Sequence, residues 1–528
     1  MLLDVRPDHL RMVLDILQKR VPQYEVWAFG SRAKWTAKDY SDLDLCIVSD
    51  QPLSFSLLGA LAEDFSDSDL PWKVDVVDWA TVSESFRKII ARDKVVVQKA
   101  GMSEWTSSTL ADVSLDVSYG YTESASSDNV GPRFLRITDI QNGVVDWSNV
   151  PYCPISEANH QKYRLDPGDI VVARTGNSTG ENFLYKGSED AVFASYLIRF
   201  RIDSQKADSG FVWYNLRSDK WWGFINNSKT GSAQAGANAK VLGQFQISFP
   251  SLDEQRAIAH ILGTLDDKIE LNRRMNETLE AIARAIFKSW FVDFDPVRAK
   301  MSGEPPESIC QRLGLTPDLL ALFPDRLIDS ELGEIPEGWS ASTLGSHIEI
   351  FDSKRVPLSN REREKRKGIY PYYGATSVMD HVDDFIFDGI YVLIGEDGSV
   401  VKENGEPFLQ YVWGKFWVNN HAHVLQAKKP VSNEHLLLML KQTNVASFVT
   451  GAVQLKISQG NLKRIPFVSA TEPLIKNFAK IIAPLFDMIR AREDEIKILI
   501  EERDALLPKL LSGELRVPDL EGKLRVTA

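Results

Sequence analysis

The sequence predicts a multidomain α+β protein in which an N-terminal α/β domain precedes two mixed α/β modules separated by two long helices. Three observations predict this class. The chain has 528 residues, which is too long for one hydrophobic core. Residues 230–262 reappear at 450–482 with a constant offset (451 − 231 = 220). After each copy, apolar residues recur at alternating spacings of four and three, which is the pattern of a heptad seam.

The first domain begins with a helix that leads into a strand. Residues 8–20 carry apolar residues at helical spacing, and the run 24–30 is rich in β-forming residues. That strand ends at Gly30 and Ser31. A second buried strand follows Asp42, and a third surrounds residues 73–77. The domain is therefore expected to be a small sheet with helical cover.

Carboxylates on these strands form a candidate metal site. Asp42 and Asp44 stand two residues apart, so strand alternation puts both on one face, about 7 Å apart. Such a pair can hold a divalent cation, while Gly30 and Ser31 offer backbone N–H groups to a phosphate. A third acid is expected on a neighbouring strand, where β-branched residues flank Asp75. Phosphoryl or nucleotidyl transfer requires this combination.

These elements resemble the minimal nucleotidyltransferase family, over residues 1 to about 98. The resemblance implies that Asp42, Asp44 and Asp75 are catalytic and hold Mg²⁺. It also implies that a nucleoside triphosphate binds near Gly30 and Ser31, and that a nucleotidyl group passes to an acceptor that the sequence does not identify. Two alternatives stay open: an ordinary turn with a solvated edge strand, and a folded but inactive domain.

The two heptad seams share one register, so the two long helices are expected to pair. Residues 253–292 would span roughly 60 Å as one helix. Asn272, Asn276 and Arg492 interrupt the seams, either to fix the register or because they face solvent. The seam residues are Ile258, Leu262, Leu265, Ile269, Leu279 and Ile286, and then Phe478, Ile482, Leu485, Ile489, Leu499 and Leu506.

The helix end at 287–296 and the phrase at 333–339 resemble the junction of type I restriction-modification specificity subunits, and the resemblance covers residues 102 to about 517. It implies two target-recognition domains that each read half of a bipartite site in double-stranded DNA. It also implies that the two helices form an antiparallel coiled coil on which two methyltransferase subunits dock. Those subunits would bind S-adenosylmethionine, and restriction-translocase subunits would bind ATP. The specificity portion is expected to be noncatalytic and to bind no cofactor.

The expected domain boundaries follow the repeat. Prolines and weak periodicity mark one linker, and the N-terminal domain departs from the usual pattern of the family. The boundaries are 1–98 for the nucleotidyltransferase-like domain, 102–250 for the first recognition domain, 251–297 for the first spacer helix, 298–335 for the linker, 336–470 for the second recognition domain, 471–517 for the second spacer helix and 518–528 for a tail.

The formal net charge of −12 requires any DNA site to be a local patch. Candidate readers are polar residues near strand ends and loops, each with a solvated surface position as its alternative. The run 361–367 carries five basic and two acidic residues, either as a phosphate-contacting loop or as a solvated helix. The candidates are Arg133, Arg136, Arg174, Asn177, Lys229, Gln234 and Lys240 in the first module, and Lys354, Arg355, Tyr373, Gln454, Lys456, Lys463 and Arg464 in the second.

Other sequence features narrow the class of protein. Cys46, Cys153 and Cys310 are scattered, which argues against a disulfide framework or a structural zinc site. His421 and His423 lack a companion cysteine or acid at ligand spacing, so we expect a packed or surface role. No run approaches 18 apolar residues, and the N-terminus lacks the layout of a signal peptide. A cytoplasmic protein that neither is secreted nor spans a membrane is expected.

Two functional hypotheses remain. The leading one is a DNA-recognition scaffold, supported by the repeat, the matched seams and the junction phrases. The alternative is an active nucleotidyltransferase that modifies protein or RNA in a toxin-antitoxin or phage-defence setting, with the DNA modules localising it. Asp42, Asp44 and Asp75 discriminate between these, and their presence allows both functions to coexist. A purely structural coiled-coil protein does not account for the large modules.

Overall fold

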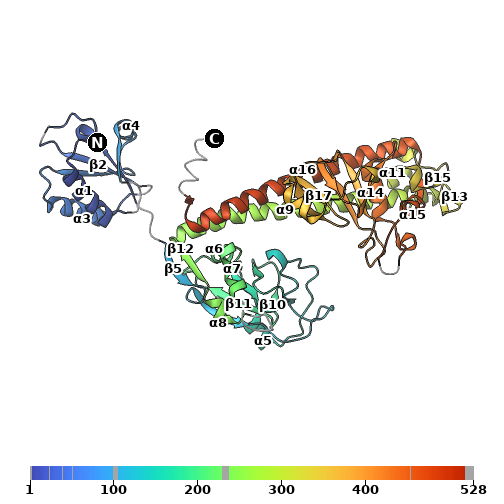
Figure 1. Cartoon of the computed structure of the whole chain (residues 1–528), viewed down its shortest axis with the longest axis horizontal. Coiled ribbons are helices and arrows are strands. Elements are labelled where there is room, and N and C mark those ends of the chain that lie inside the picture. The colour runs from blue at the N-terminus through green and yellow to red at the C-terminus, as the bar shows by residue number, and fades with distance from the viewer. Residues whose placement is uncertain are drawn as a thin grey trace. The chain divides into compact units, whose positions relative to one another are not determined.

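The structure is a computed structural model that describes residues 3–22, 24–38, 40–49, 52–98, 105–228, 237–451 and 454–517 (Figure 1). Its contacts divide into two compact units, one of residues 1–263 with 505–528 and one of residues 264–504. Across the described ranges, no helix has both the length and the apolar character needed to cross a membrane. The expected class, α+β with several domains, is confirmed.

The N-terminal domain is a four-stranded sheet with helices on both faces. The strand order is β3-β2-β1-β4, with β2 antiparallel to β1 and parallel to β3. Leu17 and Leu61 of α1 and α3 cover one face, while Ile90 of α4 packs near Trp27 on the other. The elements are α1 (Pro7–Arg20), β1 (Glu25–Phe29), α2 (Gly30–Ala33), β2 (Leu43–Val48), α3 (Phe55–Ser66), β3 (Val74–Asp78), α4 (Glu84–Asp93) and β4 (Val95–Gln98).

The two modules share one topology, so the repeat extends beyond the seams. Sheet β6-β11-β8-β9 in the first module corresponds to β16-β23-β20-β21 in the second. The two-stranded ladder β12-β5 corresponds to β15-β24. The parallel pair of β7 and β10 corresponds to the parallel pair of β17 and β22. In the second module, β18 and β19 extend this pair to a four-stranded sheet. Each ladder leads directly into a long helix.

Buried aromatic and aliphatic side chains form the core of each module, and in the first module helices supply many of them. The first module contains β5 (Thr106–Thr109), β6 (Ser114–Tyr119), β7 (Arg133–Leu135), α5 (Glu157–Tyr163), β8 (Asp169–Ala173), β9 (Asn182–Leu184), β10 (Ala191–Phe193), β11 (Leu197–Ile202), α6 (Ser209–Asn215), α7 (Asp219–Ser228), α8 (Ala239–Gly243) and β12 (Gln246–Phe249). The second contains β15 (Ser340–Thr343), β16 (Ile348–Ile350), α13 (Asn360–Lys365), β17 (Lys367–Tyr373), β18 (Val378–Val382), β19 (Phe387–Asp388), β20 (Tyr391–Gly395), β21 (Leu409–Val412), β22 (Lys415–Val418), β23 (Ala422–Ala427), α14 (Asn433–Lys441), α15 (Gln459–Lys463) and β24 (Pro466–Ser469).

The two long helices, α9 (Leu252–Phe291) and α16 (Glu472–Ser512), pair in antiparallel fashion (Figure 1). Within the first unit, Ile258 near the start of α9 shares a hydrophobic cluster with Leu510 near the end of α16. Within the second unit, the ring of Phe287 near the end of α9 lies 5.9 Å from that of Phe478 near the start of α16. This is the direction that the family resemblance implied.

The predicted seam residues are all buried or partly buried. The buried ones are Ile258, Leu262, Ile269, Phe478 and Ile482; the partly buried ones are Leu265, Leu279, Ile286, Leu485, Ile489, Leu499 and Leu506.

The asparagines that interrupt the first seam are buried and bond to the partner helix. The Nδ2 atom of Asn272 donates to Glu495 at 2.8 Å, and that of Asn276 donates to Glu493 at 2.9 Å. Arg492 instead bonds to the backbone of its own helix. A buried polar bond between helices disfavours any shifted pairing, because a shift would leave the asparagine unsatisfied. The two asparagines therefore fix the register.

The segment expected to be a linker, 298–335, is folded. It forms most of α10 (Asp295–Met301), then α11 (Pro306–Leu313), α12 (Pro317–Ala321) and a hairpin of β13 (Leu327–Ser330) and β14 (Gly333–Pro336). Ile309, Leu320 and Phe323 belong to the same buried cluster as Phe478. Pro306 and Pro317 of this segment, like Pro296 just before it, stand in the first turns of helices, where no backbone N–H is needed. They start helices instead of preventing them.

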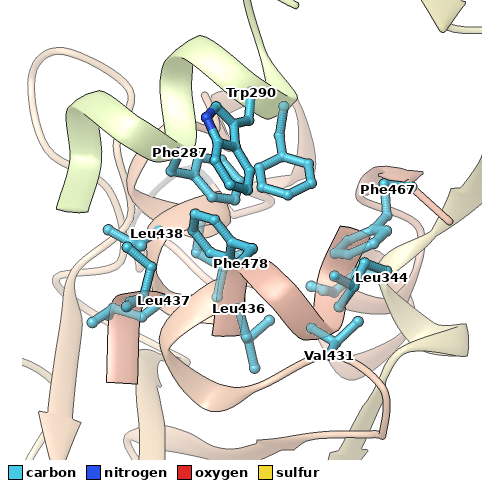
Figure 2. Packing of buried hydrophobic residues seen from close by; sticks show 14 of the residues in the cluster. Phe287, Trp290, Leu344, Val431, Leu436, Leu437, Leu438, Phe467 and Phe478 are labelled. Atoms are coloured by element: carbon cyan, nitrogen blue, oxygen red, sulfur yellow. The ribbon is translucent and has the colours of Figure 1, made fainter. Parts of the chain in front are cut away.

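An aromatic cluster joins α9, α14 and α16 in the second unit. Figure 2 shows Phe287 and Trp290 of α9 above Phe478 of α16, with Leu436–Leu438 of α14 nearby. His435 lies inside this cluster, with its ring 5.2 Å from Phe287 and 5.3 Å from Phe478. Its side chain is fully buried, and its Nδ1 atom bonds to no described residue. Burial lowers the pKa of His435 to about 3, so the ring is neutral at ordinary pH.

Acidification is therefore expected to destabilise this unit through His435. The unfolded chain takes up a proton below its pKa of 6.5, and the folded ring does not, so stability is full above that value and is lost as pH falls. Between pH 7.5 and pH 5, the free energy of unfolding should fall by about 2 kcal/mol from this group. Denaturant titrations of wild type and of His435→Gln should differ by that slope. The exposed control His381→Gln should keep the wild-type slope; equal slopes in wild type and His435→Gln would contradict the expectation.

Candidate functional site

The three predicted acids of the N-terminal domain lie on one edge of its sheet. Asp44 is on β2, Asp42 directly precedes that strand, and Asp75 is on β3. Because β2 and β3 are parallel neighbours, Asp44 and Asp75 are direct partners in the register. Asp42 is exposed, while Asp44 and Asp75 are partly buried. The structure therefore places the three acids at neighbouring positions along one sheet edge.

The three acids influence one another electrostatically. Burial raises the pKa of Asp44, and the negative charges of Asp75 and Asp42 raise it further. The ammonium group of Lys73 lies 2.5 Å from Asp75, but both side chains are solvent-exposed enough to be strongly screened. Grouped carboxylates that repel one another bind a hard divalent cation well, because oxygen ligands and negative charge are what it prefers. The donor set fits Mg²⁺.

The turn at Gly30 leaves room for this site. Gly30 has a φ of +77°, which favours glycine, and it follows Phe29, the register partner of Asp44. A Cβ atom at Gly30 would lie 2.1 Å from the Oδ2 atom of Asp44. Only glycine lets the backbone approach the carboxylate this closely. Ser31 follows in α2, so the predicted phosphate-binding turn stands directly beside the acids.

Two further residues support the site without belonging to it. Arg32 is buried and donates to the carbonyl of Ser41 at 2.9 Å, which holds the residue next to Asp42. Asp78 is also buried, but it accepts hydrogen bonds from the amides of Leu53 and Ala80. Asp78 therefore has a structural role. Sequence inspection did not find Arg32, because its role depends on a contact across nine residues.

In the first module, two of the predicted DNA-contacting residues line one polar cavity of about 590 Å³. Arg133 donates to the carbonyl of Val150 and stacks over Tyr152, and among the described residues it has no carboxylate partner. Arg136 is paired with Asp139 at 2.8 Å. The polar residues around the cavity include Ser126, Ser127, Arg133, Arg136, Asn149 and Tyr152.

The other predictions for the first module have mixed outcomes. Arg174 is partly buried and donates to the carbonyl of Ser195, so it acts mainly within the fold. Asn177 and Lys240 are exposed. Lys229 and Gln234 lie outside the described residues. Of the candidates predicted for the first module, Asn177 and Lys240 on the surface and the two arginines that line the cavity can therefore reach a ligand.

In the second module, Lys354, Gln454, Lys456, Lys463 and Arg464 are exposed.

The two other predicted residues of this module, Tyr373 and Arg355, are partly buried and make contacts within the module. Tyr373 packs edge-on against Phe416. Arg355 is almost buried and pairs with Glu396 at 2.7 Å, so its assignment as a direct DNA contact is corrected to an internal role.

The basic run 361–367 forms α13 and the start of β17. Its charges are partly neutralised, because Arg363 and Lys367 pair with Asp380 and Arg366 pairs with Asp383. The solvated-helix alternative therefore describes most of this run.

His423 is fully buried, in agreement with the expected packed role, and the fold brings acids to both His421 and His423. The Nδ1 atom of His423 lies 2.6 Å from the Oδ2 atom of Asp352, and Glu396 is also close by. His421 pairs with Asp397. These acids come from distant parts of the chain, so local spacing could not show them.

Comparison with known proteins agrees with both predicted resemblances. Residues 102–281 and 336–500 match the type I restriction modification DNA specificity domain, and residues 10–98 match the nucleotidyltransferase domain. The N-terminal part is 57% identical over 97 residues to the probable protein adenylyltransferase MntA of Haemophilus influenzae, which covers 18% of this chain and 85% of that protein.

The rest of the chain resembles specificity subunits. The type I restriction enzyme HindI specificity subunit of Haemophilus influenzae is 25% identical over 480 residues, covering 78% of this chain and 100% of that protein. The crystal structure of the type I restriction-modification S subunit from M. genitalium aligns with a TM-score of 0.47 and 18% identity, covering 77% of this chain and 96% of that one. The specificity-domain match spans more than half of the chain. The chain therefore belongs to the type I restriction-modification DNA specificity family, as a specificity subunit that carries an N-terminal nucleotidyltransferase domain.

Proposed function

We propose that this specificity subunit reads a bipartite DNA sequence, one half-site with each module. The shared topology of the two modules carries this proposal, because two similar modules on antiparallel helices match two separated half-sites. The same backbone bond recurs in both: Ala237 donates to the carbonyl of Arg174 at 2.9 Å, and Ile457 donates to that of Glu396 at 2.9 Å (457 − 237 = 220). Divergent side chains on one scaffold then give two different specificities.

Base and phosphate contacts are assigned to the two predicted arginines that line the cavity and to the predicted residues that stay exposed. Lysine contacts phosphate, glutamine and asparagine can form bidentate bonds to a base, and arginine does both. The assigned residues are Arg133, Arg136, Asn177 and Lys240 in the first module, and Lys354, Gln454, Lys456, Lys463 and Arg464 in the second.

Methyltransferase subunits are proposed to dock on the paired helices. In the second unit, apolar side chains on these helices stay more than one-third exposed, which is costly unless a partner covers them. These partners would carry S-adenosylmethionine, and restriction subunits would add ATP-driven cleavage. The exposed apolar residues are Leu271, Met275 and Ile282 on α9, and Ile481, Met488 and Ile498 on α16.

Genome-wide mapping of adenine methylation tests this function. In cells that express the chain with its neighbouring methyltransferase, one split motif should be methylated, and it should vanish when the chain is deleted. Substituting Lys463 and Arg464 together with alanine should weaken methylation, because exposed cations contribute phosphate contacts. A methylome that does not change on deletion would contradict the proposal.

A second function, protein nucleotidylation, is supported by the acid triad and by the adenylyltransferase relative. We infer that Asp42, Asp44 and Asp75 would hold the divalent cation and that the Gly30–Ser31 turn would receive the triphosphate. The cation, when bound, would neutralise charge on the phosphates and orient them. An acceptor hydroxyl oxygen of a protein forms a bond to the α-phosphorus, its proton is lost to solvent or base, and pyrophosphate leaves. Incubation with α-labelled ATP and Mg²⁺ should label a co-purified protein.

A further inference from the structure

A largely buried group of ionisable side chains links distant segments of the second module. Asp352 lies in the 3-10 turn after β16, Glu396 follows β20, and His423 is on β23. The Nδ1 atom of His423 lies 2.6 Å from Asp352, and Arg355 donates to Glu396 at 2.7 Å. His423 is 0% exposed and Asp352 is 8% exposed. We call these four residues the buried network.

The buried network contacts residues 454–457, which we call the recognition loop. The Nε2 atom of His423 donates to the carbonyl of Ile457 at 2.8 Å. The amide of Ile457 donates to the backbone carbonyl of Glu396, and the ammonium group of Lys456 lies 3.2 Å from the Glu396 carboxylate. The recognition loop is therefore attached to the buried network by both backbone and side-chain bonds.

The backbone of the recognition loop is held while the side chains of three of its residues stay exposed to solvent. Lys456 exchanges two 2.8 Å backbone hydrogen bonds with Thr450, and the carbonyl of Leu455 accepts from Gly398 at 2.9 Å. The side chains of Gln454, Leu455 and Lys456 are exposed. A rigid backbone that presents a glutamine and a lysine is suited to base and phosphate contact, because ordering costs little on binding.

The buried network supplies its own positive charge. By residue type, Asp352, Glu396 and His423 could hold a metal ion. However, the guanidinium group of Arg355 lies 2.7 Å from Glu396 and 3.5 Å from Asp352, and Lys456 also pairs with Glu396. Two carboxylates thus face two cationic side chains, and both nitrogens of His423 are hydrogen-bonded. The charges of the cluster are satisfied by the protein itself.

The fold does not require these charges, as the first module shows. There the strand-end position equivalent to Glu396 is Arg174, which accepts the same backbone bond from Ala237. Arg174 stacks 5.2 Å from the ring of Tyr119 and donates to the carbonyl of Ser195, with no buried carboxylate among its described partners. The backbone contact is common to both modules, whereas within the described ranges the charged network is found at this position of the second module only.

We propose that the buried network positions the recognition loop, so that its residues are positioning residues for reading the second half-site. The proposal rests on the proposed function, in which Gln454 and Lys456 contact DNA. Arg355, Asp352 and His423 act through the loop and do not touch the DNA themselves.

Binding by the full complex of this chain with its methyltransferase subunits tests the proposal. Duplexes would carry the mapped motif, the motif with only half-site 1 changed, or the motif with only half-site 2 changed. Asp352→Asn, which removes the charge at constant size, should reduce discrimination at half-site 2 about tenfold, the size of one good base contact. Discrimination at half-site 1 should be unchanged. Asp388→Asn, an exposed acid of the same module, is the matched control and should behave as wild type.

Coupling to Gln454 separates positioning from general destabilisation. If Asp352 acts through the recognition loop, Asp352→Asn combined with Gln454→Ala should discriminate no worse than Gln454→Ala alone. Additive losses, or full half-site 2 discrimination by Asp352→Asn, would overturn the proposal. Should Asp352→Asn fail to assemble, the isosteric Glu396→Gln is the second variant, with the same expectations.

Hydrogen exchange gives a readout that does not depend on DNA. The amides of Lys456 and Ile457, which bond to Thr450 and Glu396, should exchange at least about tenfold faster in Asp352→Asn than in Asp388→Asn. If amide exchange in Asp352→Asn equals that in Asp388→Asn, the buried network does not position the recognition loop, even if the wild-type protein reads both half-sites. Increased exchange in a protein that shows no half-site preference would instead reject the proposed DNA function and leave the loop contact standing.

Discussion

Replacing Asp44 with asparagine is expected to abolish nucleotidyl transfer and, without divalent metal, to leave the N-terminal domain at least as stable as wild type. Burial and the charges of Asp75 and Asp42 raise the pKa of Asp44, which means that its ionised form is disfavoured until a cation arrives. Removing one of the three charges relieves that repulsion. It also removes a cation ligand, so transfer of label from α-labelled ATP should fall by at least about 100-fold, since even outer partners of a ligand are worth roughly 10–100-fold.

Thermal unfolding with and without Mg²⁺ makes this prediction specific. Mg²⁺ should raise the melting temperature of wild type, because it binds the folded triad, and should not raise that of Asp44→Asn. Asp69→Asn makes the same charge change at an exposed position of the domain and should retain both activity and the Mg²⁺ response. A variant that keeps its transfer activity, or that loses it together with its folded domain, would contradict a catalytic cation site at Asp44.

The triad could be predicted from sequence because its parts are local. Asp42 and Asp44 are two residues apart on a recognisable strand, and Asp75 stands among β-branched residues on the next candidate strand. The structure adds the parallel pairing of β2 with β3, which makes Asp44 and Asp75 neighbours. Strand pattern alone does not distinguish parallel from antiparallel pairing. The close approach of Gly30 to Asp44 likewise depends on how the strands align.

The paired helices could also be predicted, because a heptad seam is a periodic signal over some forty residues. The buried network could not. Its members Asp352, Glu396 and His423 are separated by 44 and 27 residues and meet only through the crossovers of one sheet (396 − 352 = 44; 423 − 396 = 27). Arg355 accordingly appeared to be a surface reader when it is an internal counterion. A charged residue that would bind DNA on the surface pairs with other protein groups when it is buried, and the sequence alone does not show which residues are buried.

The segment 298–335, expected to be a linker, is folded into helices and a hairpin. Its prolines indicated a connector, but Pro306 and Pro317 stand where helices begin. Ile309, Leu320 and Phe323 pack into the cluster around Phe478. The segment therefore helps to bury the junction between α9 and α16, and the phrases at 287–296 and 333–339 that marked the family resemblance flank one hydrophobic core.

Phe478 is the residue of that core whose truncation should destabilise the second unit most. It is completely buried, and its ring lies 4.9 Å from Phe291, 5.6 Å from Trp290 and 5.3 Å from His435. Phe478→Ala removes the ring and leaves a cavity that the surrounding helices cannot fill by rotating side chains. The free energy of unfolding should fall by about 3–5 kcal/mol. For a unit of this size the melting temperature would fall by roughly 10 °C.

The loss of stability should be confined to the second unit. This outcome would show that the core around Phe478 unfolds locally and that the two long helices do not unfold as one element. Ile258 and Leu262 belong to a separate cluster in the first unit, so hydrogen exchange around them should change little in Phe478→Ala, while α14 and the start of α16 should lose protection. Met488→Ala, an exposed change on the same helix, should stay within about 0.5 kcal/mol of wild type. Equal loss of protection in both clusters would mean that the two helices unfold as one cooperative element, and that the two modules cannot vary independently in stability.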